Sequence, residues 1–102
     1  MKKQVAVLLG VGSIGQAIIR RVGAGKHIVL ADYNVQNTLA ATKILGDAGF
    51  ECSQIQTDLG SKESIIELVK FAQSKGEVMN VIKKTYKNEI CYFCFLIIIR
   101  LW

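Results

Sequence analysis

The segment "VAVLLGVGSIGQAIIRRVG", Val5 to Gly23, decides the fold of this chain, because glycines join an apolar run to a helical pattern. Three of these glycines, Gly10, Gly12 and Gly15, have the spacing G-x-G-x-x-G. This spacing between a strand and a helix is typical of dinucleotide sites, but glycine-rich turns also occur without any ligand. The residues on either side of the loop are therefore needed to decide between a nucleotide site and a tight turn.

The segments on either side of the loop predict a strand, a helix and a second strand. Residues 5–10, "VAVLLG", and residues 27–32, "HIVLAD", are short apolar runs rich in β-branched residues. Such runs suit strands that are buried on both faces of a parallel sheet. Between them, apolar residues at helical spacing predict a helix that ends near Gly23 and is apolar at Ile14, Ile18, Ile19 and Val22.

The alternation of strands and helices continues to residue 82. One apolar face predicts a second helix ending at Gly49, with Leu39, Ala41, Ile44, Leu45 and Ala48 on that face. Residues 50–58 predict a third strand, and residues 78–82 a fourth. Ser61 is a suitable cap for a third helix, which ends before Gly76 and buries Ile65, Ile66, Leu68, Val69 and Ala72. The fold class is therefore α/β, a Rossmann-like parallel sheet with helices on both faces.

The position of the glycine loop predicts a role for each of its residues in binding a cofactor. Gly10 makes the turn, Gly12 lets the backbone approach a pyrophosphate, and Gly15 lets the helix pack closely on the strand. Ser13 and Ile14 belong to the first turn of the helix, whose free N–H groups and partial positive charge favour phosphates. We expect all five residues to bind the cofactor.

An acidic residue stands where the dinucleotide motif requires one. Asp32 ends the second apolar run, 22 residues after Gly10, so its carboxylate can accept hydrogen bonds from both hydroxyls of a ribose. The same charge repels a 2′-phosphate, and the following residues, Tyr33 and Asn34, supply no arginine to neutralise one. This favours NAD over NADP, with Tyr33 beside the cofactor. Taken alone, Asp32 also suits a helix cap or a solvated turn.

Three segments, "GVGSIGQA", "ADYN" and "TDLGSKESI", resemble the short-chain dehydrogenase/reductase family, and the resemblance covers residues 4–82. The glycine spacing departs slightly from that family, which usually has G-x-x-x-G-x-G. The resemblance implies that Asp58 and Leu59 border the adenine ring. Asp58 equally suits a cap of the third helix or a turn before it.

Catalysis in that family depends on a serine and a Tyr-x-x-x-Lys pair, and this chain has no such pair. The residues four positions after Tyr33, Tyr86 and Tyr92 are Asn37, Ile90 and Leu96. Without a positioned proton donor, carbonyl reduction loses a factor of roughly 10² to 10⁴. We therefore expect residues 1–82 to be an NAD(H)-binding Rossmann half-domain that is not catalytically competent alone. The alternative is a non-enzymatic dinucleotide-binding module that regulates an assembly.

Residues 83–102 differ from the rest of the chain and are expected to form a divergent tail. "KKTYKNE" stands where the family has an Asn-Asn-Ala-Gly-like segment, and residues 90–99 are an unbroken apolar run. Ten residues are too short to span a bilayer as a helix. The run predicts a fifth strand or a segment that is buried in a homo-oligomer. We expect the homo-oligomer to form through residues 90–99 or through the edge of the sheet. The abrupt change suggests a truncated family member whose tail comes from a shifted reading frame.

Charge and cysteine content exclude several classes of function. The net charge is +5, but residues 1–82 contribute only +2 and residues 83–102 contribute +3, and no aromatic residues interleave with the basic runs. This pattern does not indicate a nucleic-acid or membrane partner. Three cysteines without a secretion signal favour the cytoplasm. Cys91 and Cys94 form one C-x-x-C pair, which cannot complete a zinc site alone.

Overall fold

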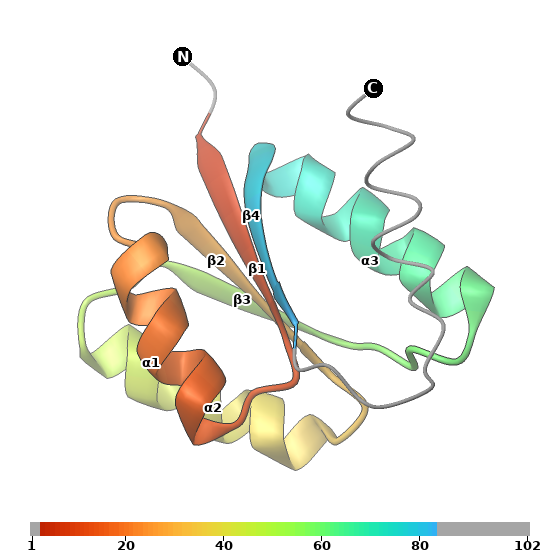
Figure 1. Cartoon of the computed structure of the whole chain (residues 1–102), viewed down its shortest axis with the longest axis horizontal. Helices are drawn as coiled ribbons and strands as arrows, with labels where there is room; N and C mark the ends of the chain where they lie inside the picture. Colours follow the sequence, from red (N-terminus) through yellow and green to blue (C-terminus); the bar gives the residue numbers. More distant parts are fainter. Residues whose placement is uncertain (1–2, 84–102) are drawn as a thin grey trace.

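The computed structural model describes residues 3–83, which form a four-stranded parallel sheet with helices on both faces (Figure 1). The elements in chain order are β1 (Gln4–Leu9), α1 (Ser13–Val22), β2 (His27–Asp32), α2 (Val35–Asp47), β3 (Cys52–Gln56), α3 (Lys62–Lys75) and β4 (Glu77–Lys83). The predicted α/β class and parallel Rossmann-like sheet are confirmed. Most of the predicted tail, including the apolar run at 90–99 and the Cys91/Cys94 pair, lies outside the described residues.

The sheet has the strand order β3-β2-β1-β4, so β1 is an inner strand. Residues 5–9 of β1 are at most 1% exposed, because helices cover both faces of the strand. Val5, Val7 and Leu9 pack in the layer that contains α3. Ala6 and Leu8 pack in the opposite layer, which contains α1 and α2. A continuous apolar run is what such a strand needs, since neither face meets water.

The helices begin and end at residues whose chemistry supports those boundaries. The side chain of Asn34 caps α2 by accepting from the N–H groups of Gln36 and Asn37. Ser61 caps α3, as predicted, by accepting from the N–H of Ser64. Gly76 ends α3 at a φ of 151°, a conformation that side chains rarely adopt.

Some expected core positions are wrong. Ile18, Leu39 and Ile44 are 40%, 45% and 49% exposed. The residues of α2 that do face the sheet are Thr38, Ala41 and Leu45, whose spacing of three and four fits a narrow helical stripe. Single apolar side chains are common on protein surfaces. Apolar spacing alone therefore did not identify which residues of the helix are buried. In α3, Ile65, Leu68, Val69 and Ala72 are buried as predicted and Ile66 is half-buried.

The order of the strands creates a crevice at the carboxyl end of β1. Along the chain, β2 is added beside β1 and β3 beside β2, on the same side of β1. The connection through α3 then crosses to the other side of β1, where β4 pairs with it (Figure 1). The helices that follow β1 and β3, α1 and α3, therefore lie on opposite faces of the sheet. Ligands of open α/β sheets bind at such a switch point.

Within the described residues, no helix is long and apolar enough to cross a membrane.

The junction between α3 and β4 predicts a large difference between two glycine substitutions. A Cβ at Gly76 would overlap the main-chain carbonyl of Lys3, which accepts a hydrogen bond from the N–H of Glu77. Gly76→Ala is expected to lower the free energy of unfolding by at least about 2 kcal/mol, measured by urea denaturation. Gly46→Ala, in open space on α2, is the control and is expected to raise it by about 0.5–1 kcal/mol. Equal stability of the two variants would contradict this account of the junction.

Candidate functional site

The glycine loop turns sharply between β1 and α1. Gly10 has a φ of 83°, and its N–H donates to the carbonyl of Ala31 at 2.8 Å, which ties the loop to the end of β2. Gly12 is the N-cap residue of α1, and a Cβ built on it would meet nothing within 4 Å. The backbone at Gly12 is therefore open to close approach by another molecule.

Gly15 holds α1 close to the sheet. A Cβ at this position would lie 2.8 Å from Leu8 Cδ1 and 3.2 Å from the carbonyl oxygen of Gly10. Both distances are shorter than ordinary contacts, so a larger residue would push the helix away from β1 or displace Leu8. The packing role predicted for this glycine is confirmed.

The carboxylate of Asp32 joins the end of β2 to the glycine loop. Its Oδ2 accepts from the main-chain N–H of Val11 at 3.1 Å, and its Oδ1 accepts from the N–H of Asn34 at 3.0 Å. Hydrogen bonds to a charged group contribute roughly 1.5–3 kcal/mol each. Asn34, and not Asp32, caps α2. Asp32 therefore sets the position of the loop as well as presenting a negative charge beside it.

The amino end of α1 is available to an anion. No side chain of the described residues caps this helix, and its first turn contains no acidic residue. The N–H of Gln16 already donates to the carbonyl of Gly12, and the side chain of Gln16 donates to the carbonyl of Val11 at 2.9 Å. The N–H groups that precede it in the first turn carry the positive end of the helix dipole.

A hollow of about 300 Å³ lies between the carboxyl ends of β1, β2 and β3. It brings together five of the residues singled out in the sequence, and its full lining is Gly10, Ala31, Asp32, Tyr33, Thr57, Asp58, Leu59 and Gly60. The other four, Gly12, Ser13, Ile14 and Gly15, lie in the loop and first turn of α1 and are not part of the lining. The volume is at the lower end of the range of small-molecule sites.

The segment after β3 resolves the alternatives for Asp58. Its Oδ1 accepts from the N–H of Gly60 at 2.9 Å, which closes a turn, and its own N–H donates to Ser64 Oγ at 2.9 Å. Ser61 caps α3, so Asp58 belongs to the preceding turn. The turn places Leu59 at the edge of the hollow.

Two features of this site were not predicted. The N–H of Val11 binds Asp32, although the fingerprint assigns no role to the residue between the first two glycines. Thr57 lines the hollow, is 2% exposed, and its Oγ1 has no hydrogen-bond partner among the described residues. A threonine before an Asp-Leu pair carries no sequence signal of its own, so only the structure could find it.

Comparison with known proteins places this geometry in a family. No protein-family model matches the chain. A short-chain dehydrogenase/reductase of Alternaria brassicicola is 37% identical over 82 residues, which cover 80% of this chain and 30% of that protein. The actinorhodin polyketide ketoreductase, solved with NADPH, has a TM-score of 0.75 and 25% identity over 83% of this chain and 34% of its own. The chain carries the amino-terminal Rossmann fold of a short-chain dehydrogenase/reductase.

A solved short-chain dehydrogenase/reductase from Burkholderia phymatum, in complex with NAD, has a TM-score of 0.64 and 25% identity. It covers 72% of this chain and 27% of its own length. The chain thus spans about a third or less of the length of these three proteins. Their printed cofactors are NADPH in one case and NAD in the other.

The bond between Asp32 and the loop predicts a local effect of Asp32→Ala in the absence of any ligand. The N–H of Val11 loses its acceptor, so its hydrogen exchange is expected to accelerate by roughly tenfold or more, measured by NMR. The N–H of Gly10, which donates to Ala31, is expected to keep most of its protection. Asp47→Ala, at an exposed position near the end of α2, is the matched control. Unchanged exchange at Val11 would show that the bond does not hold the loop.

Proposed function

We propose that residues 3–83 bind the adenosine diphosphate part of a nicotinamide dinucleotide and prefer NAD to NADP. The observation that carries this proposal is the position of Asp32, whose carboxylate lines the hollow and also holds the glycine loop beside it. A negative charge and the first glycine of the turn line this hollow, and the amino end of α1 follows directly after the turn. These are the parts that recognise a ribose and a pyrophosphate.

The pyrophosphate is expected to lie over the loop at the amino end of α1. The open backbone at Gly12 admits a phosphate without a side-chain clash, and the first turn offers main-chain N–H groups. Ser13 and Ile14 would contribute their main-chain N–H groups there. Gly10 and Gly15 act indirectly, since one makes the turn and the other keeps α1 close to β1.

The ribose of the adenosine is expected to bind Asp32. A carboxylate has about four acceptor sites, and Val11 and Asn34 use one on each oxygen, so both oxygens can still accept from ribose hydroxyls. A 2′-phosphate in the same place would meet this charge, and no lysine or arginine is part of the hollow's lining. The result is a preference for NAD.

The adenine ring is expected to lie against Leu59, in the turn closed by Asp58. Leu59 is half-buried and packs against the core layer beneath α3, which makes it a fixed apolar surface. Tyr33 is 69% exposed at the mouth of the hollow, where its ring can cover the outer side of the adenosine. Flat apolar contact on a ring contributes affinity without requiring a charged partner.

Calorimetric titration of the full chain tests this proposal. NAD is expected to bind at least about tenfold more tightly than NADP, and Asp32→Ala is expected to weaken NAD at least about tenfold while NADP changes less. Asp47→Ala is the control and should retain the parent affinities, because its charge lies away from the hollow. Equal affinity of the parent and Asp32→Ala for NAD would count against the ribose contact.

We also propose that these 102 residues bind the cofactor without reducing a carbonyl. No tyrosine in the chain has a lysine four residues later, so the proton that must reach the carbonyl oxygen has no positioned donor of that kind. We expect no consumption of NADH above background with a panel of ketones, at NADH concentrations that saturate the protein. Turnover abolished by substitution of a residue in this chain would contradict the proposal.

A further inference from the structure

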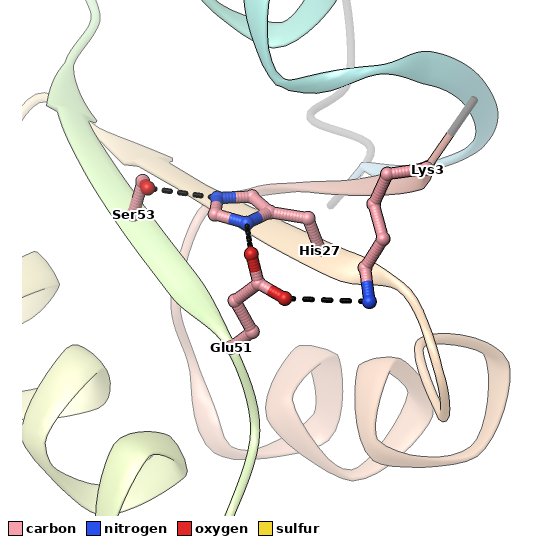
Figure 2. A network of polar contacts seen from close by, with 4 residues as sticks. All are labelled: Lys3, His27, Glu51 and Ser53. Carbon is pink, nitrogen blue, oxygen red and sulfur yellow. Dashed lines mark hydrogen bonds and ion pairs between the residues drawn. The ribbon is translucent and has the colours of Figure 1, made fainter. Parts of the chain in front are cut away.

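A second cluster of polar side chains lies at the amino ends of the strands, far along the sheet from the dinucleotide site. His27 is the first residue of β2, and its ring lies between Glu51 and Ser53 on the neighbouring chain segment (Figure 2). His27 Nδ1 is 2.9 Å from Glu51 Oε1, and His27 Nε2 is 2.7 Å from Ser53 Oγ. Glu51 Oε2 is in turn 3.3 Å from the ammonium group of Lys3.

The register of the sheet explains why these residues meet. Ile28 pairs with Cys52 in the parallel ladder between β2 and β3. His27 is therefore opposite Glu51, and Ser53 is the next residue of the neighbouring segment on the same face of the sheet. The imidazole is 7% exposed and both of its nitrogens have a side-chain partner, so the ring is held in one orientation.

The charge of Glu51 fixes the tautomer of the neutral ring. The hydrogen bond from His27 and the bond from Lys3 both lower the pKa of the Glu51 carboxyl, so this group is ionised at neutral pH. A carboxylate can only accept, and Nδ1 must therefore carry the proton that it donates to Glu51. Nε2 is then the unprotonated nitrogen, and it accepts the hydroxyl proton of Ser53. This is the arrangement in which a histidine acts as general base toward a serine.

The sheet also supplies a donor beside Ser53. The N–H of Ile28 donates to the carbonyl of Glu51, and in a parallel ladder this turns the main-chain groups of Glu51 and Ser53 toward β2. The N–H of Gln54 therefore points away from β2, at the outer edge of the described sheet. An amide directly after a nucleophile is a common donor to the oxyanion of acyl transfer. Ser53 is half-buried, which leaves access for a small acyl group.

We propose that Ser53, His27 and Glu51 form a second reactive site, in which Ser53 is a nucleophile that accepts small acyl groups from esters. Ser53 and His27 are the catalytic residues, and Glu51 is a positioning residue that orients the ring. Nothing in this site depends on the dinucleotide, because it lies at the opposite ends of the strands from Asp32.

The proposed reaction proceeds in two balanced steps. Ser53 Oγ forms a bond to the acyl carbon while its proton moves to His27 Nε2. The bond from that carbon to the alcohol oxygen breaks, and the alcohol leaves with the proton from Nε2. Water then attacks the acylated serine with His27 again taking the proton, and it releases the carboxylic acid and restores Ser53. No oxidant, reductant or metal is required.

Labelling of the full chain with diisopropyl fluorophosphate tests the proposal, because this probe reacts with activated serines. The oxygen of Ser53 replaces fluoride on phosphorus, and mass spectrometry of the digested protein locates the adduct. Labelling is expected at Ser53, to be absent in Ser53→Ala, and to slow roughly 10²-fold or more in His27→Gln. Ser74→Ala is the matched control and should label like the parent, since Ser74 Oγ donates only to the carbonyl of Phe71 in the described residues.

The role of Glu51 needs a measurement that a purely structural contact would not change. Glu51→Gln keeps a hydrogen-bonding side chain beside Nδ1 but removes the charge. Its labelling rate is expected to reach a lower plateau in a pH profile while its urea midpoint stays close to that of the parent. No adduct on Ser53 in the parent protein, or labelling at an equal rate in a folded His27→Gln variant, would overturn the proposal.

Discussion

The burial of β1 on both faces is the constraint on which the rest of this structure depends. A strand with no solvated face needs a helical layer on each side, and the chain supplies α1 and α2 on one side and α3 on the other. In the sheet, β1 lies between β2 and β4, and the helices that follow β1 and β3 lie in opposite layers. The loop that leaves β1 must turn at once toward α1, which requires the positive φ of Gly10 and the close contact at Gly15.

The same constraint produces the candidate site. The loop leads into α1, whose amino end has no side-chain cap among the described residues, and Asp32 holds the loop through the N–H of Val11. The carboxylate is thus part of the scaffold before any ligand is present. A site that is shaped in advance loses less free energy to ordering when it binds. Residues that match about a third of the length of these relatives therefore hold the parts of the candidate site in place on their own.

Much of the fold could be read from the sequence because its signals are local. Apolar runs predicted β1 and β2, Ser61 predicted the start of α3, and glycine spacing predicted the loop. The exposure of Leu39 could not be predicted, since helical periodicity does not say which of two adjacent apolar stripes will meet the sheet. The meeting of His27 with Ser53 depends on strand register, which relates residues 26 positions apart and has no local signal.

The two ends of the described sheet have different chemistry. At the carboxyl end, the side chain of Asp32 lines a hollow and also holds the glycine loop that leads into α1. At the amino end, an imidazole joins a carboxylate to a hydroxyl (Figure 2).

Titration of the isotope-labelled full chain with NAD, followed by NMR, tests the central claim most directly. We expect saturating shifts that are largest at the amides of Val11, Gly12, Asp32 and Leu59. Shifts that do not saturate there, or that cluster instead around His27 and Glu51, would contradict it.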